Sequence, residues 1–442
     1  MDITELRQLL RDEITQRREE GCDTSPVEAQ AEQLEAASAD EMLALYERLM
    51  RLEPRPDFRY EEPSDLPTIH ALRPAGPRHL AAPWDEQRLL DRILGAYLGR
   101  CAGCNLGKPV EGWTRDKIRR YLEAAHAYPL HSYFPVLQPF PEGLALHPNY
   151  KETTLGHIKW MARDDDIDYT ILGLHYLETY GLDFTTENVG EAWLQLLPYQ
   201  QVYTAERAAY RNLVEGYAPP HTATRFNPYR EWIGAQIRAD GFGYVCPGLP
   251  EVAADLAYRD ATLSHVKNGI YGEMWVAAML AAALVAPGHT VEDIRWVIEI
   301  GLSEIPQNCR LAEAIRDVMR WHQETPHWEE TWQRVHDKYG HYHPVHTINN
   351  AALVAMALLY GEGELEKTIC IAVMGGWDTD CNGATAGSVI GAMLGAEALP
   401  YKWVGPLNNL VRSMVAGYDL SQLTNLAERS LAIAREVRDR WG

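Results

Sequence analysis

From Trp84 to the end of the chain, apolar residues recur every three or four positions, the spacing that places them on one face of an α-helix. The alternation of apolar and polar residues that marks half-buried strands is nearly absent. This pattern predicts an all-α fold, a single large compact multi-helix domain with an N-terminal helical extension. The clearest predicted helices cover residues 85–103, 165–180, 187–197, 250–260, 270–286, 290–301, 309–322, 347–360, 364–373 and 383–396.

Residues 1–53 are predicted to be a separate N-terminal helical element. Apolar residues from Ile3 to Ile14 follow helical spacing, and Ser38 with Glu41 three positions later is typical of a capping box at a helix start. Two interpretations remain open for this element. It is either a helical pair packed on the main domain, or an arm that binds a partner or a second copy of the chain.

Proline is unusually dense in residues 54–84, where it removes amide donors and prevents regular structure. This stretch is therefore predicted to be a linker or an extended arm, and residues 85–442 the main all-α domain. Within the main domain, residues 114–160 are rich in aromatic residues, Pro and His. They are predicted to form a long irregular insertion, and such loops are often functional.

Charge and cysteine usage narrow the possible functions. The formal net charge of −21 argues against a direct nucleic-acid footprint, which needs a basic surface. The longest apolar stretch, from Met274 to Ala286, is too short to span a bilayer, so no membrane association is expected. Seven scattered cysteines are typical of reduced thiols, and no secretory signal is predicted at the N-terminus. The expected location is the cytoplasm.

An acidic run, Arg163-Asp164-Asp165-Asp166-Ile167-Asp168, opens the predicted helix at 165–180. Neighbouring carboxylates repel one another unless a cation or several hydrogen-bond donors lie among them, and such oxygen clusters favour hard cations such as Mg²⁺. The alternative is a helix N-terminus whose acidic residues cap the helix and interact with its dipole. Taken alone, the run does not decide between these interpretations.

A second acidic pair favours the metal interpretation. Gly375-Gly376-Trp377-Asp378-Thr379-Asp380-Cys381-Asn382 places two aspartates before a helix with glycine at every fourth position from Gly383 to Gly395. Such a glycine ridge lets a neighbouring helix approach closely. Two helices whose acidic N-termini converge would form a carboxylate cage for one or two metal ions.

A third segment, from Gly95 to Glu111, also carries glycine at four-residue spacing and ends at Gly107-Lys108-Pro109. Pro109 stops the helix, so Glu111 is expected in the following loop, where a carboxylate could act as a general base beside a metal site. An exposed loop glutamate without a catalytic role is the alternative.

In this order, the three segments resemble the signature blocks of the ADP-ribosylglycohydrolase family, which includes the dinitrogenase-reductase-activating glycohydrolases. Gly95 to Glu111 is similar to the family's G-A-x-x-G-x-x-x-G-D-x-x-G-x-P-x-E block. The acidic run at Asp164 is similar to its T-D-D block, and the segment from Trp377 to Asn382 to its G-D-T-D-[TS]-N block. The resemblance covers roughly residues 85–400 and leaves the N-terminal element unmatched.

The resemblance implies an all-α domain of the family type and a site with two Mg²⁺ ions that bind ribose hydroxyls. The positions that match metal-binding or catalytic positions of the family are Glu111, Asp165, Asp166, Asp378 and Asp380. Among them, Glu111 matches a flexible glutamate, and it is expected with Asp166 and Asp378 to take part in catalysis. Asp164 is expected as an additional ligand.

Several positions depart from the family pattern. Asp164 stands where the family usually has Thr, Cys381 where it has a hydroxyl, Cys104 where it has Asp, and Trp377 where it has Gly. Cys381 thus occupies a position in the metal-ligand block, although a neutral thiol is a poor ligand for Mg²⁺. These changes bear on the substrate more than on the fold.

The expected function is therefore that of an Mg²⁺-dependent hydrolase that cleaves a glycosidic bond at ribose C1. Its expected partner is an ADP-ribose-like small molecule or an ADP-ribosylated macromolecule. Two alternatives remain: an N-glycosidase of a small nucleoside or nucleotide, and a non-catalytic relative that binds ADP-ribose. The sequence does not indicate the oligomeric state.

Three other signals carry less weight. Cys101-x-x-Cys104 lacks a matching second pair and is interpreted as helix packing. His341, His343 and His346 lack neighbouring carboxylate or thiolate ligands at metal-binding spacing. The aromatic residues Trp377, Phe242 and Tyr244 are candidates for stacking on an adenine ring.

Overall fold

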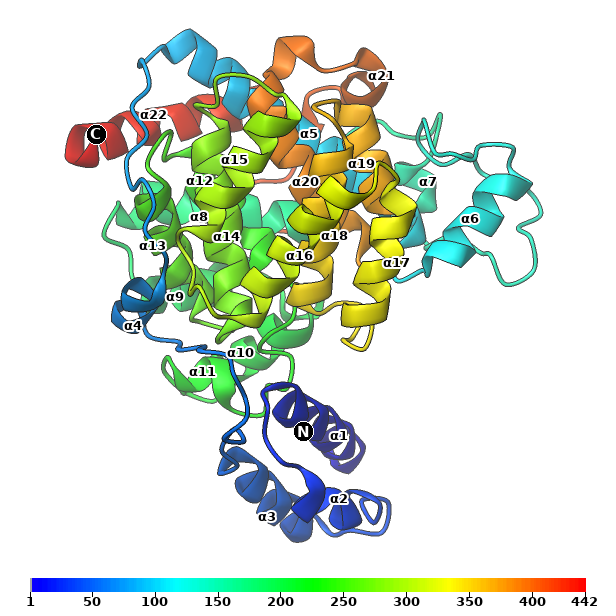
Figure 1. Cartoon of the computed structure of the whole chain (residues 1–442), viewed down its shortest axis with the longest axis vertical. Coiled ribbons are helices and arrows are strands. Elements are labelled where there is room, and N and C mark those ends of the chain that lie inside the picture. Colours follow the sequence, from blue (N-terminus) through cyan, green and yellow to red (C-terminus); the bar gives the residue numbers. More distant parts are fainter. Residues whose placement is uncertain (1) are drawn as a thin grey trace.

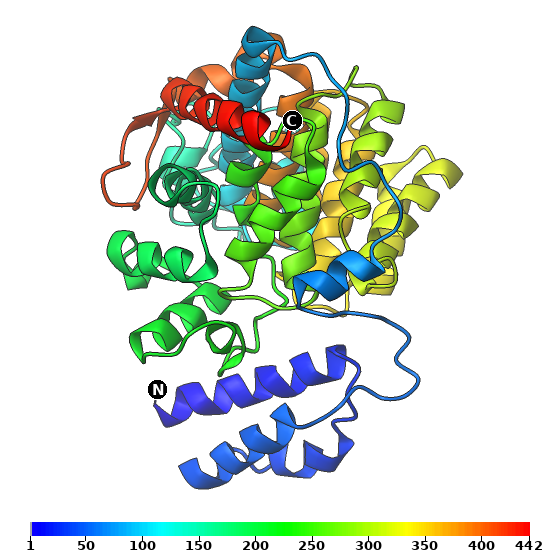
Figure 2. The ribbon, with the colours of Figure 1, turned by 90° about the vertical axis from the view of Figure 1, so that its left-hand side faces the viewer.

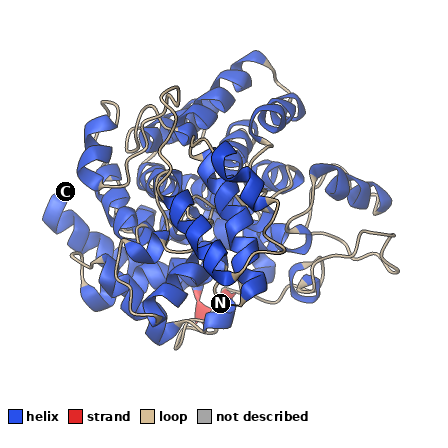
Figure 3. Ribbon diagram, turned by 90° about the horizontal axis from the view of Figure 1, so that it is seen from below, coloured by secondary structure: helices blue, strands red, loops and turns tan. Residues whose placement is uncertain are grey.

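Helices account for nearly all regular structure in the protein. The computed structural model describes residues 2–442, and within them are 22 α-helices and one pair of two-residue strands (Figures 1 and 3). The strands, β1 (Leu410–Val411) and β2 (Ser421–Gln422), are antiparallel. The prediction of an all-α fold is confirmed.

Two glycine-rich helices, α5 (Glu86–Gly107) and α20 (Thr379–Leu394), pack backbone to backbone. The facing pairs are Gly95 with Gly391, Gly99 with Gly387 and Gly103 with Gly383. A Cβ atom added to any of these residues would overlap a backbone carbonyl of the opposite helix, so only glycine permits this approach. The pairing is antiparallel, so the C-terminal end of α5 lies against the N-terminal end of α20.

The other helices surround this pair and complete one continuous hydrophobic core. Those around the pair are α8 (Asp165–Tyr180), the short α12 (Asp240–Tyr244), α13 (Pro250–Ala261), α14 (Asn268–Ala283), α15 (Val291–Leu302), α16 (Arg310–Glu324), α17 (Trp328–Tyr339), α18 (Thr347–Tyr360), α19 (Leu365–Met374) and α22 (Leu423–Trp441). At the periphery lie α9 (Thr186–Leu196), α10 (Thr204–Val214), α11 (His221–Thr224) and α21 (Tyr401–Val404). Every residue of α14 is buried, which explains why its sequence is apolar on all sides.

The prediction for residues 114–160 was only partly correct. Much of the segment is irregular, but it contains α6 (Arg115–Ala124) and the short α7 (Tyr150–Thr153). α6 forms because Thr114 caps its first turn and because Ile118, Tyr121 and Leu122 bury one face. The segment projects from the side of the molecule, at the right of Figure 1.

The start of α20 also differs from the predicted range of 383–396. The helix begins at Thr379, so both aspartates of the second acidic pair lie at its first turn, and it ends at Leu394. Gly395 then adopts a φ of 83°, in the left-handed region that terminates helices readily at glycine.

The first three helices, α1 (Ile3–Glu19), α2 (Ser25–Ala31) and α3 (Ala39–Met50), have a hydrophobic cluster of their own. They lie together at one end of the molecule (Figure 2). The capping box of Ser38 and Glu41 is present at the start of α3. Buried ion pairs attach these helices to the rest of the protein: Arg230 lies 2.9 Å from Glu13 and 3.0 Å from Glu20.

Residues 54–84 follow the surface from α3 to α5 as an extended segment interrupted by α4 (Leu66–Leu72) (Figure 2). The segment is fixed along its length. Glu62 forms an ion pair with Arg310, Arg73 with Glu304, and the Leu80 amide donates to the Gly248 carbonyl.

No helix within residues 2–442 combines the length and the apolar character needed to cross a bilayer.

We expect Gly387→Ala to lower the free energy of unfolding by about 1–3 kcal/mol, because the added methyl group forces α5 and α20 apart. Chemical denaturation measures this change. The control is Gly190→Ala in α9, where the added atom meets side-chain methyl groups of the half-buried Leu213, which can move. Equal losses in the two variants would contradict the importance of the backbone contact.

Candidate active site

The contact between α5 and α20 brings the loop after α5 beside the turn that precedes α20. A short 3₁₀ turn (Lys108–Val110) ends α5, and Glu111 follows it. The Gly112 amide donates to the Trp377 carbonyl at 3.0 Å, and the Trp377 amide donates to the Trp113 carbonyl at 3.0 Å. The backbone next to Glu111 is therefore fastened to the turn that carries Asp378, while the Glu111 side chain remains 38% exposed.

The first acidic run meets the second at the N-terminal end of α8. Asp164 is the N-cap of this helix, and one of its carboxylate oxygens accepts a hydrogen bond from the Asp166 amide at 3.1 Å. The Cys381 thiol donates to Oδ2 of Asp166 at 3.3 Å, although the two residues are 215 positions apart. The acidic N-termini of α8 and α20 thus converge.

Lys108 lies between the two acidic segments. Its Nζ is 2.7 Å from Oδ2 of Asp164, 2.9 Å from Oδ2 of Asp380 and 2.8 Å from Oε2 of Glu111. Sequence reasoning had identified Lys108 only as part of a helix end. Its position three residues before Glu111, at the end of a glycine-rich helix, is the signal that could have found it.

Asp168, the last carboxylate of the run, has a different environment from the others. It accepts hydrogen bonds from Arg163 at 2.8 Å, from the Ser413 hydroxyl at 2.7 Å and from the Met414 amide at 3.0 Å. Both of its oxygens are therefore satisfied by donors of the protein. Asp168 fastens the start of α8 to residues 413–414 and is not available to a ligand.

Arg100 contacts the Asp166 carboxylate in the interior of the protein. This fully buried guanidinium group lies 3.3 Å from Oδ1 of Asp166 and 2.8 Å from Oδ2 of Asp240. Sequence reasoning missed Arg100 because it occupies one of the variable positions between the glycines of α5. It compensates charge in the interior and fixes the orientation of the Asp166 carboxylate.

Asn350 on α18 holds the turn before α20. Its Oδ1 accepts hydrogen bonds from the Asp378 amide at 3.3 Å and from Nδ2 of Asn382 at 2.8 Å. In the structure it positions Asp378 from inside α18.

Burial and neighbouring charges set the protonation of the carboxyl groups in the site. Burial, followed by repulsion from Asp380 and Glu111, raises the pKa of Asp378 well above its ordinary value. Burial and the neighbouring carboxylates likewise raise the pKa of Asp166, against the effect of Arg100. Burial opposes ionisation of Asp164 as well, but Lys108 outweighs it and holds the pKa of that carboxyl below its usual range. A bound cation would favour the ionised form of each carboxyl group.

Two buried groups of side chains have potential metal-ligand atoms within 4.8 Å of one another: Asp378, Asp380 and Cys381 in one, and Cys104, Asp164 and Asp166 in the other. In the first group, Oδ1 of Asp380 is buried without a hydrogen-bond partner, as expected for an oxygen that serves a cation. The second group includes Cys104, which sequence reasoning had interpreted only as packing. Burial, reinforced by nearby carboxylates, raises the pKa of both thiols well above the ordinary value, so neither is a ready thiolate ligand.

The carboxylates face a cavity of about 610 Å³. Asp165, Asp378, Asp380, Lys108 and Glu111 lie in its wall. Its other lining residues come from the projecting segment (His147, Asn149 and Glu152), from the loop before α10 and the first residue of that helix (Gln201, Tyr203 and Thr204) and from elsewhere (Ala162, Arg163, Glu206, Ile233, Gly234, Ile237, Val345, Cys381 and Met414).

The aromatic residues expected to stack on a base do not line this cavity. Phe242 and Tyr244 are fully buried in α12, and Trp377 packs near Trp332. The hypothesis was wrong for these residues because they complete the core. Tyr203 lines the cavity instead and is 43% exposed. Its loop position between Gln201 and Thr204 gave no periodic signal.

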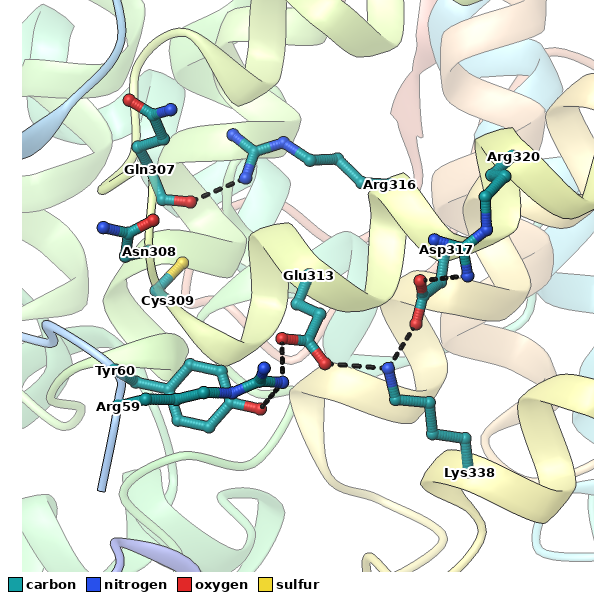
Figure 4. Close-up of a pocket in the computed structure, with 10 residues that line it drawn as sticks. All are labelled: Arg59, Tyr60, Gln307, Asn308, Cys309, Glu313, Arg316, Asp317, Arg320 and Lys338. Carbon is teal, nitrogen blue, oxygen red and sulfur yellow. Dashed lines mark hydrogen bonds and ion pairs between the residues drawn. The ribbon is translucent and has the colours of Figure 1, made fainter. Parts of the chain in front are cut away.

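A second surface pocket, of about 480 Å³, is lined by charged residues of α16, α17 and the extended segment (Figure 4). Its charges are paired within the protein. Lys338 contacts Glu313 at 2.7 Å and Asp317 at 2.6 Å, and Arg59 contacts Glu313 at 2.6 Å. Both carboxylates of this pocket, Glu313 and Asp317, are thus paired with basic side chains, whereas Oδ1 of Asp380 in the cavity at α20 has no partner.

Residues 85–440 match the ADP-ribosylglycohydrolase family, and the chain belongs to this family. One similar solved structure is described as an ADP-ribosylglycohydrolase-related protein complex; it is 20% identical, with a TM-score of 0.49, over 79% of this chain and 99% of that chain. No curated protein matches the chain.

Membership of the family identifies the protein as a glycosidic hydrolase, and the resemblance seen in the sequence is confirmed. The family is metal-dependent and acts on ADP-ribosylated substrates. The two buried acidic groups are candidates for holding a metal.

We expect Asp168→Asn to lower the free energy of unfolding by about 1–3 kcal/mol, because Arg163 loses a charged acceptor in a largely buried position. Thermal or chemical denaturation measures the loss. The same variant is expected to bind Mn²⁺ as the wild type does, since both Asp168 oxygens are already occupied by protein donors. Loss of Mn²⁺ binding with unchanged stability would contradict the assignment of Asp168 as a structural residue.

Proposed function

We propose that the protein is an Mg²⁺-dependent hydrolase that cleaves the glycosidic bond at ribose C1 of an ADP-ribosylated or related ribosyl substrate. The observation that carries the proposal is the convergence of buried carboxylates from α8 and α20 at the wall of one cavity. So many acidic side chains in one place favour a hard cation as their ligand.

Asp378, Asp380, Asp166 and Asp165 are the residues we propose to hold the cation. All four are carboxylates, the ligand type that Mg²⁺ prefers, and the unpartnered Oδ1 of Asp380 is a ready donor. When bound, the ion would supply a Lewis acid that polarises oxygen ligands and stabilises negative charge. The Cys381 thiol donates a hydrogen bond to Asp166, so its proposed role is to orient that carboxylate and not to bind the metal itself.

Glu111 is the proposed general base. Removal from water and the negative charge of Asp380 raise the pKa of Glu111 to about 7, although the side chain keeps contact with solvent. A carboxyl group with a pKa near neutrality can accept a proton from an attacking water and later release it. Glu111 and Asp378 lie in the wall of the same cavity, so the Glu111 side chain would be close to a ribose bound there.

The cavity supports an ADP-ribose-like ligand in size and chemistry. Its volume of about 610 Å³ lies within the usual range for small-molecule sites. Tyr203 offers an exposed aromatic face for an adenine ring, and Asn149 and Gln201 offer polar groups for hydroxyl or phosphate oxygens.

The cytoplasm is the proposed location. All seven cysteines carry free thiols, which a reducing compartment preserves.

We expect Asp378→Asn to reduce kcat/KM for release of ADP-ribose from an ADP-ribosylated protein by at least about 100-fold, because a charged group that stabilises the transition state is lost. Removal of divalent ions with a chelator should give a similar loss that added Mg²⁺ reverses. Product chromatography measures both effects. The control is Asp337→Asn, which neutralises a side chain that is 67% exposed on α17 and should leave the rate unchanged.

The product distinguishes the competing functions. Release of a free base from a small nucleoside, without release of ADP-ribose from modified protein, would favour an N-glycosidase. If the wild type releases neither product and calorimetry shows the same absence of Mg²⁺ binding in wild type and Asp378→Asn, the hydrolase proposal is wrong and a non-catalytic ADP-ribose-binding protein is favoured.

A further inference from the structure

We propose that the ammonium group of Lys108 permanently occupies one of the two cation positions in this site, so that the chain binds a single divalent ion beside Asp378 and Asp380. The inference rests on the proposed metal-dependent function and deepens it. It departs from the expectation of two Mg²⁺ ions, and it follows from the contacts of Lys108 and from the chemistry of the residues around it.

Lys108 has the environment of a bound cation. Its Nζ contacts carboxylates from three separate elements: Asp164 at the start of α8, Asp380 in the first turn of α20, and Glu111 in the loop after α5. The side chain is only 11% exposed. Surface lysines rarely hold a fixed position with three acidic partners, because their flexible side chains lose entropy in doing so.

The lysine remains charged in this environment. Its ammonium group is surrounded by the carboxylates of Asp164, Asp380 and Glu111 at 2.7–2.9 Å, and nearby negative charges favour the charged form of a lysine. A permanent positive charge therefore lies where the first and second acidic segments meet.

The ammonium group excludes a divalent ion from the same carboxylates. Mg²⁺ binds carboxylate oxygens at about 2.0–2.1 Å. An ion that bridged Oδ2 of Asp164 and Oδ2 of Asp380 on the side of Lys108 would occupy the space that Nζ fills.

The residues near Asp164 offer fewer free ligand atoms than those near Asp378. The neighbouring potential ligand is Cys104, whose side chain is fully buried, and a thiol is a poor ligand for Mg²⁺. Oδ1 of Asp166 already faces the guanidinium group of Arg100. By contrast, Oδ1 of Asp380 has no partner, and Asp378 lies beside it.

Asp164 and Lys108 compensate each other. Asp164 adds a carboxylate where the family usually has a threonine, and Lys108 supplies the positive charge that the added carboxylate needs. The carboxylate and the ammonium group neutralise each other, so no metal ion is needed to balance the charge of Asp164.

The experiment counts Mn²⁺ ions bound to the full-length chain, with the electron paramagnetic resonance signal of free Mn²⁺ as the readout. The expected result is one ion per chain for the wild type and two for Lys108→Met. The control is Lys159→Met, which removes an exposed lysine outside the cavity wall and should leave the count at one.

Should Lys108→Met fail to fold, the double variant Lys108→Met/Asp164→Thr removes one positive and one negative charge together, and it too should bind two ions. Two ions in the wild type, or one ion in every variant, would overturn the inference and leave the metal-dependent function standing. An absence of bound Mn²⁺ in the wild type and the variants would overturn both.

Discussion

The backbone contact between α5 and α20 determines where the acidic residues of this protein can meet. Facing glycines let the two helices approach until carbonyl groups of one touch the backbone of the other. The antiparallel arrangement then places the end of α5 at the start of α20, and the loop with Glu111 pairs with the turn at Trp377. Any side chain larger than hydrogen along this contact would separate the helices and, with them, the two halves of the site.

The resulting cluster brings several negatively charged side chains close together. Carboxylates from the starts of α8 and α20 meet in a buried region, where repulsion is weakly screened, and Asp164 and Asp380 both contact Nζ of Lys108, at 2.7 and 2.9 Å. The protein provides three kinds of compensation: Arg100 beneath Asp166, Lys108 between the acidic segments, and hydrogen-bond donors around Asp168. The negative charge that remains uncompensated lies at the start of α20, and there we propose that a divalent ion binds.

The sequence was sufficient for the helical fold and for the glycine ridges, because periodicity and spacing along the chain encode these features. The meeting of the two acidic segments was a hypothesis based on their charge, and the family resemblance supported it. It was insufficient where long-range packing decides. Nothing local distinguishes Asp168, which binds protein donors, from Asp166 two positions earlier. The role of Arg100 depends on Asp240, which contacts it from a distant part of the chain. Phe242 is buried by neighbours that are distant in sequence, so its local sequence could not show that it is unavailable to a base. Which of the predicted residues bind metal or substrate remains a proposal.

The most direct test is a crystal structure of the protein grown with Mn²⁺ and ADP-ribose, with anomalous scattering to locate the metal. The account predicts an anomalous peak bonded to carboxylate oxygens of Asp378 and Asp380, facing the cavity, with the ribose of the ligand beside it. An ADP-ribose molecule bound elsewhere, or a well-diffracting crystal without metal near these two side chains, would contradict it.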